Sequence, residues 1–306
     1  MTWRAVTGGA AVVVASSAAA WAVAYPHSPP AAAAVRAVTD CAAVVAVGLA
    51  TVPMLDGARY RGDLARTASG PLAVGGVVWL LAELVRLVVM TAQAAAVPIQ
   101  HLGLRTVTEF ALYTAAGRSG LASVVTAMAV CAVALLAPHT ASVIVATIGI
   151  AAAGMAARTL TGHLAEDPVG GIAVAVHALA AALWCGVLAA LVLTVTHRGQ
   201  WARVLPRFSQ LSLGCVAVLL VAGVSGALLG LDSVTALWAT GYGRLLSVKI
   251  VLTAGLLVLA WRNRAGWLPA ARAHRSSARL SRRRSLAELA IMAVAITFAA
   301  ALAVTG

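Results

Sequence analysis

Long runs of apolar residues, separated by short polar segments, extend along the whole chain. A membrane-spanning helix needs roughly 20 consecutive apolar residues. By this measure we predict nine spans, at about residues 5–25, 33–55, 71–97, 119–137, 140–160, 170–196, 209–230, 245–263 and 286–305. The pattern therefore predicts an all-α fold, a polytopic transmembrane helix bundle of about nine spans.

The first apolar run has a second interpretation. Arg4 precedes an Ala/Val run, and small residues follow around Ala20–Ala24, as at the cleavage site of a signal peptide. Cleavage there would leave eight spans and the same orientation for the others.

Composition and charge support a membrane protein and suggest its orientation. Of the 306 residues, 62% are hydrophobic and only 10% are charged, too few to cover a soluble domain of this size. With a cytoplasmic N-terminus, 15 of the 22 Lys and Arg residues fall on the cytoplasmic side and four on the outer side. This bias follows the positive-inside rule and places the C-terminus outside the cytoplasm. The net charge of +13 therefore records orientation in a cell membrane, and we expect no nucleic-acid partner.

The largest basic segment is RNRAGWLPAARAHRSSARLSRRRS (262–285), on the predicted cytoplasmic side. Such a segment serves as an orientation signal and contacts anionic lipid headgroups. Binding of a soluble partner is the alternative.

Two histidines stand out in the stretch RTLTGHLAEDPVGGIAVAVHALAAALW (158–184). His163 lies in a predicted outer loop beside Glu166 and Asp167, and His177 lies about 10 Å into the next span. Since the two flanking spans form an antiparallel hairpin, these imidazoles are predicted to converge near the outer rim. Met155 and Met90 have comparable depths, and imidazole with thioether is a ligand set that selects copper. The alternative is that the histidines only hydrogen-bond neighbouring helices and the methionines fill the core.

Other polar residues within the spans have simpler explanations. Glu83 and Arg86 are spaced i,i+3, and Arg36 and Asp40 are spaced i,i+4, so each pair can neutralise itself on one helix. A polar track through the bundle is the alternative. The four cysteines are Cys41, Cys131, Cys185 and Cys215, and all lie in apolar runs without a CxxC motif. We interpret them as small hydrophobic side chains. The alternative is that Cys41 or Cys185 is a soft metal ligand. No enzyme signature is present, so we do not expect an enzyme.

The C-terminal half resembles a known family. The segment RFSQLSLGCVAVLLVAGVSGALLGLDSVTALWATGYGRLLSVKIVLTAGLLVLAWRNR (207–264) is similar to the copper resistance protein D (CopD/PcoD) family, in the order of its Arg-Phe-Ser, Tyr-Gly-Arg-Leu-Leu, Lys and Asn-Arg elements. HALAAALWCG (177–186) and Thr161-Gly162-His163 resemble further elements of that family. The resemblance covers about residues 155–305. It implies an N-terminal membrane region (1–117) with about three spans and a CopD-like membrane domain (118–306) with about six.

The resemblance implies an inner-membrane protein that imports copper, often together with a periplasmic copper carrier. Its functional positions carry over to His163 and His177, whereas Tyr242, Gly243, Arg244 and Lys249 match positions that we interpret as architectural. The cargo would be Cu(I) or Cu(II), held by His163 and His177 with Met155 or Met90. Two alternatives remain: a haem-bearing or electron-transfer protein with axial histidines, and a factor that delivers copper to an oxidase without transport.

Overall fold

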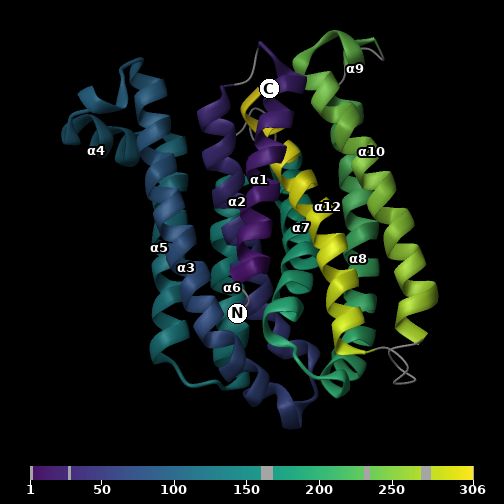
Figure 1. Cartoon of the computed structure of the whole chain (residues 1–306). Helices are drawn as coiled ribbons and strands as arrows, with labels where there is room; N and C mark the ends of the chain where they lie inside the picture. Colours follow the sequence, from purple (N-terminus) through teal and green to yellow (C-terminus); the bar gives the residue numbers. More distant parts are fainter. Residues whose placement is uncertain (1–2, 27–28, 160–167, 231–234, 270–276, 306) are drawn as a thin grey trace.

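The chain forms an elongated bundle of long helices (Figure 1). The computed structural model describes residues 3–26, 29–159, 168–230, 235–269 and 277–305, and all regular structure in these ranges is helical. The elements in chain order are α1 (Trp3–Ala24), α2 (Pro30–Thr51), η1 (Val52–Leu55), α3 (Ala58–Ala95), η2 (Ile99–His101), α4 (Leu104–Tyr113), α5 (Ala115–Leu136), α6 (Ala141–Thr159), α7 (Pro168–Thr194), α8 (Arg198–Gly230), α9 (Ala236–Ala239), α10 (Gly241–Arg262), η4 (Asn263–Trp267) and α12 (Ala278–Thr305).

The predicted fold class is confirmed. Within the described ranges, nine helices are long and apolar enough to cross a membrane. The short helices α4 and α9 lie with the C-terminus at one end of the bundle, which we call the α9 end (Figure 1). Two helices extend further than predicted: α3 begins at Ala58 and α8 at Arg198, so that Pro71 and Pro206 lie inside them. Both extensions lie at the other end, which we call the basic end.

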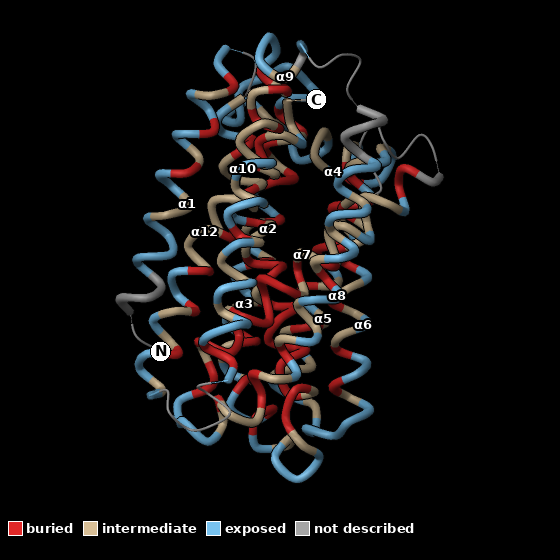
Figure 2. The backbone as a smooth tube through the Cα atoms, turned by 90° about the vertical axis from the view of Figure 1, so that its right-hand side faces the viewer, coloured by how far each residue is buried: buried red, intermediate tan, exposed pale blue. Residues whose placement is uncertain are grey.

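Helices α2 and α7 form the centre of the bundle. In the apolar 18-residue stretches of α2 and α7, 72% and 56% of the residues are buried, against 11% in that of α8. Both contribute heavily to the main apolar core, and Figure 2 shows the buried segments gathered around them. Since α7 is apolar around its whole circumference, it can be enclosed by neighbours on every side.

The contact between α2 and α7 is made by backbone atoms. A Cβ atom added to Gly48 would lie 1.9 Å from the carbonyl carbon of Gly186, and one added to Gly186 would lie 2.0 Å from the Val44 carbonyl oxygen. Neither neighbour is a flexible side chain that could move aside. Small residues permit such close approach in membranes, where dispersion contacts between helices drive their association. Glycine is therefore required at both positions.

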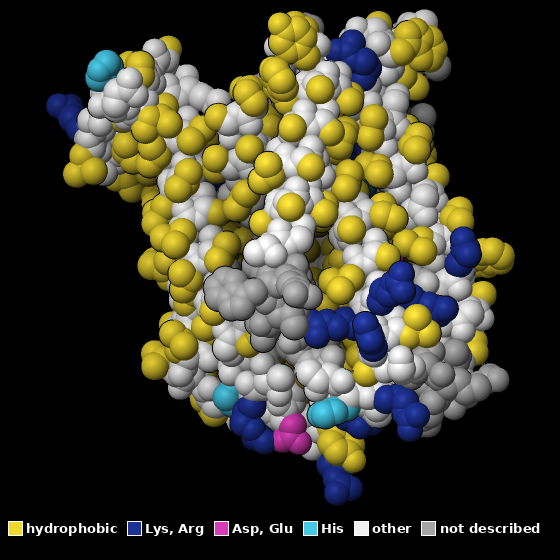
Figure 3. Space-filling view, in the orientation of Figure 1, with side chains coloured by type: hydrophobic (Ala, Val, Ile, Leu, Met, Phe, Trp, Pro, Cys, Tyr) yellow, Lys and Arg dark blue, Asp and Glu magenta, His cyan; other side chains and the backbone are white. Residues whose placement is uncertain are grey.

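A second contact fixes the basic end. Arg203 of α8 donates two hydrogen bonds to the buried carboxylate of Asp56, each 3.0 Å long, and its guanidinium lies 4.2 Å from the centre of the Tyr60 ring. Arg207 donates to the Leu55 carbonyl at 2.9 Å. The connection between α2 and α3 is thereby held to α8. Figure 3 shows Lys and Arg side chains gathered over this half of the visible face, as the sequence census predicts.

We predict that Gly48→Ala and Gly186→Ala each destabilise the protein by roughly 1–3 kcal/mol, the usual cost of forcing an extra carbon into a packed interior. The measurement is thermal unfolding of the purified protein in detergent. Gly149→Ala is the matched control, because nothing lies within 4 Å of the added Cβ on this exposed helical glycine. Equal melting temperatures for all three variants would contradict the tight crossing.

We predict that the Asp56–Arg203 contact makes stability depend on pH. Burial alone would raise the pKa of Asp56, but hydrogen bonds from Arg203 and the Gly57 amide and the charges of Arg203 and Arg207 together lower it below its ordinary value. Because the folded-state pKa lies below the unfolded value of about 3.9, the contact stabilises the fold above that pH and is lost as pH falls through the folded value.

The variant Asp56→Asn should be less stable than the unchanged protein by about 1–3 kcal/mol at neutral pH, because charged hydrogen bonds of this kind contribute that much. The difference should shrink below about pH 4. Unfolding in detergent across a pH series measures it, with Asp63→Asn, an exposed partner of Arg66, as control. A difference that stays constant into strong acid would contradict this assignment.

Candidate metal site and charge network

The predicted histidine pair can be placed only in part. His163 lies outside the described residues, so its distance from His177 is not defined here. His177 is half-buried on α7 and faces α8, where the backbone of Leu219 hydrogen-bonds to the ring and Gly223 lies beside it. The charge of Lys249 on α10 also acts on this imidazole. His177 thus packs between α7 and α8, close enough to Lys249 for that charge to act on the ring.

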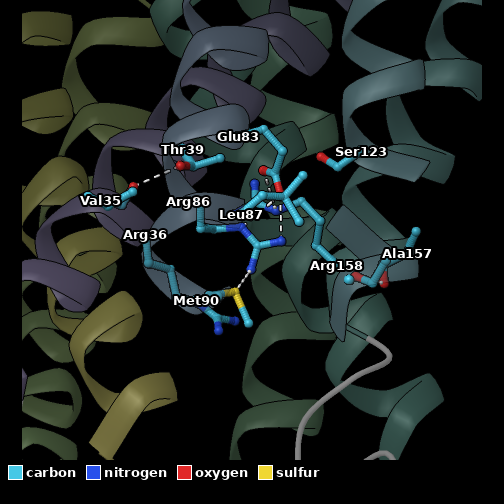
Figure 4. Close-up of polar contacts among 12 residues, drawn as sticks. Val35, Arg36, Thr39, Glu83, Arg86, Leu87, Met90, Ser123, Ala157 and Arg158 are labelled. Carbon is cyan, nitrogen blue, oxygen red and sulfur yellow. Dashed lines mark hydrogen bonds and ion pairs between the residues drawn. The ribbon is translucent and has the colours of Figure 1, made fainter. Parts of the chain in front are cut away.

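The two predicted methionine ligands have other neighbours. Met155 is buried on α6 and belongs to the main apolar core. Met90 on α3 accepts a hydrogen bond from Nη1 of Arg86 at 2.8 Å, so a guanidinium already lies against its sulfur (Figure 4). Across the described ranges, no three His, Cys, Asp or Glu side chains form a group that could hold a metal ion. The role of Met155 and Met90 as copper ligands stays a prediction.

Instead, the polar feature that the structure builds is a buried charge network on α2, α3 and α6 (Figure 4). Arg158 of α6 lies at its centre, 2.5 Å from Asp40 of α2 and 3.5 Å from Glu83 of α3. Arg86 donates to Glu83 from Nε at 2.7 Å, and Arg36 lies 3.8 Å from Asp40. The two predicted intrahelical pairs are therefore confirmed, and Arg158 joins them.

The network carries one excess positive charge. It contains three guanidinium groups and two carboxylates, with the Glu83 side chain fully buried and that of Arg158 only 5% exposed. Charges in such a position are costly unless each has a partner of opposite sign. The network therefore ties three helices together, and it places a positive field in that part of the bundle.

Arg158 is one of the four basic residues that the sequence analysis counted on the outer side. It lies in the last turn of α6 and is buried, which the apolar pattern did not predict. Glu288 was also missed: it is buried on α12 and accepts a hydrogen bond from Asn263 at 2.7 Å. The i,i+3 and i,i+4 spacings reveal pairs on one helix, but nothing in the spacing reveals partners on different helices.

Arg244 has the architectural role that its family position suggested. It donates to the backbone carbonyls of Val23 at 2.8 Å and Tyr25 at 2.9 Å, which attaches the start of α10 to the end of α1. Gly241 lies at the same junction, where an added Cβ would be 2.8 Å from the Ala24 carbonyl oxygen. The close packing of the backbone at this junction leaves little room for a side chain at position 241.

Nine apolar helices in the part of the chain that the structure describes, internal charge pairing and a basic end define a multi-pass integral membrane protein. Two family models match it: copper resistance protein D over residues 202–302, and the copper resistance protein D-like N-terminal domain over residues 27–174. The chain belongs to the copper resistance protein D family and is a copper-related membrane protein. The second match extends the resemblance well beyond the C-terminal half in which the sequence motifs were recognised.

No curated protein and no solved structure matches the chain significantly.

We predict that Glu83→Gln destabilises the protein more than Arg158→Met does. Losing Glu83 leaves Arg86 and Arg158 facing a neutral amide, a loss of about 3–5 kcal/mol for a broken buried pair. Losing Arg158 leaves two arginines and two carboxylates, which still balance. Unfolding in detergent gives the ranking.

The control for this ranking is Glu109→Gln, which removes the partner of Arg105 from a pair that is largely exposed. Such pairs contribute under about 1 kcal/mol. If Glu83→Gln is as stable as Glu109→Gln, or more stable, this account of the network is wrong.

Proposed function

We propose that this protein imports copper from the extracytoplasmic side of a cell membrane, with the α9 end facing outward. The observation that carries the proposal is the match of both copper resistance protein D models across the nine-helix bundle. The excess of basic residues at the other end supports this orientation under the positive-inside rule. In this proposal copper is the transported substrate, and the chain catalyses no covalent chemistry.

His177 is the proposed inner ligand of the entry site. Its imidazole is half-buried between α7 and α8. Lys249 opposes a cation at this ring by Coulomb repulsion. Capture therefore needs further donors, a role that we assign to His163, with Met155 or Met90 as thioether ligands. A periplasmic copper carrier would supply the ion at the outer rim.

Copper accumulation in cells tests the proposal. We expect expression of the chain to raise the initial rate of copper uptake above that of an empty vector. His177→Ala should lower this increment roughly tenfold or more, because changes even in outer-shell partners weaken metal sites 10–100-fold. His163→Ala should act in the same direction. All variants are compared at equal membrane expression.

His197→Ala is the matched control, because this histidine is exposed at the basic end, away from the proposed entry site. It should transport as the unchanged chain does. Uptake equal to that of the empty vector, with a correctly folded chain, would sink the import proposal and favour copper delivery without transport. Full activity of both His163→Ala and His177→Ala would remove the ligand assignment.

A further inference from the structure

Three of the four cysteines lie at mid-height on helices that pack against one another, α2 against α7 and α7 against α8. Cys41 lies on α2, Cys185 on α7 and Cys215 on α8, and all have free thiols. Cys185 and Cys215 are buried, and Cys185 is within electrostatic range of both other thiols and of the Glu288 carboxylate. Cys131 lies apart from them, with its thiol 3.7 Å from the Ala73 carbonyl of α3.

The glycine crossing explains how Cys41 and Cys185 approach each other. Cys185 immediately precedes Gly186, whose backbone touches that of Val44 and Gly48. Cys41 precedes Val44 by three residues, which is about 4.5 Å along the helix axis. Because α2 and α7 run in the same direction, both thiols lie on the same side of the crossing and within about one turn of it. This level is near the middle of the span Pro30–Leu55.

Small size alone does not account for three cysteines here. Cysteine can serve as a small hydrophobic side chain in a tight core. This chain, however, fills its small buried positions chiefly with alanine, and it has only four cysteines among 306 residues. Three of those four lie on the adjoining helices α2, α7 and α8, and the property that distinguishes them from alanine is the sulfur.

We propose that Cys41, Cys185 and Cys215 form a mid-membrane relay for Cu(I), in which two thiolates hold the ion at a time and Cys185 belongs to both pairs. Soft thiolate sulfur selects Cu(I) over hard cations. Among the described residues no three such side chains are preassembled around one point, which suits a transient two-coordinate ion better than a resident one. The choice of copper as ligand rests on the proposed function.

The protonation balance of each step is defined. Two thiols and one Cu(I) give a bis-thiolate complex with a single negative charge, and two protons are released. When the ion moves to the next pair, the thiolate that it leaves takes up the proton that the incoming thiol loses. No electron is transferred in either step.

The test measures Cu(I) binding to the full chain in detergent under reducing conditions, by competition with a chromophoric Cu(I) chelator. The starting variant carries His163→Ala and His177→Ala, so that the proposed entry site does not contribute. We expect it to bind one Cu(I) with sulfur ligands in X-ray absorption and to release protons on binding. Adding Cys185→Ala should weaken binding by more than roughly 100-fold, because it removes a ligand itself rather than an outer-shell partner.

Matched variants separate ligation from packing. Cys41→Ala or Cys215→Ala alone should weaken binding less than Cys185→Ala, because each leaves one pair intact. Cys131→Ala should bind as the starting variant does. If Cys185→Ala does not fold, Cys185→Ser and the double variant Cys41→Ala with Cys215→Ala carry the same expectation.

Two results would overturn the relay: unchanged Cu(I) affinity in Cys185→Ala, or copper bound without sulfur ligands. The binding assay does not depend on uptake. If the chain binds Cu(I) through its thiols but moves no copper in cells, the import proposal is wrong and the cysteine site still stands. Import that survives loss of all three thiols would end the relay and leave the import proposal.

Discussion

The direct backbone contact between α2 and α7 is the constraint on which the rest of the bundle depends. Lipid tails are as apolar as the helices, so the hydrophobic effect offers little to hold two such helices together. Gly48 and Gly186 allow their backbones to touch, which maximises dispersion contacts along both helices. The two most buried helices are thereby paired, and the other spans pack around them. The same contact brings the helix segments that carry Cys41 and Cys185 close to each other.

The buried charge network makes the part of the bundle around α3 and α6 electrostatically different from the part around α7 and α8. The network centred on Arg158 and Glu83 ties α6 and α3 to α2, and it has one positive charge more than its carboxylates can balance. In a poorly screened interior such an excess repels cations over many ångströms. Beyond the proposed entry site, a path for copper is therefore favoured along α7 and α8, where the donors are neutral or soft.

Much of this architecture could be predicted from the sequence, because the signals are local. Apolar runs located the nine spans, and the spacing of Glu83 with Arg86 and of Arg36 with Asp40 gave two ion pairs that the structure contains. The starts of α3 and α8 were placed too late, since their first turns are polar and contain proline. A hydropathy window detects lipid contact, and these turns extend past the apolar region.

What could not be predicted depends on which helices become neighbours. The contact of Arg158 with Asp40 and Glu83 and that of Arg203 with Asp56 each join distant parts of the chain. The same is true of the cysteines, which look like isolated small residues in four unrelated apolar runs. For the predicted entry site, the structure places His177 between helices and gives Met90 and Met155 other neighbours, while His163 lies outside the described residues.

Asp40 of the charge network and Cys41 of the proposed relay are adjacent residues on α2. Successive residues of an α-helix point about 100° apart, so neighbours in sequence contact different partners. Asp40 pairs with Arg158 of α6, whereas Cys41 is within electrostatic range of Cys185 on α7. Helix α2 therefore carries an ionic contact toward α6 and a thiol toward α7, and its own backbone separates them. That separation lets one membrane interior hold a charge network and, beside it, the neutral thiols of the proposed relay.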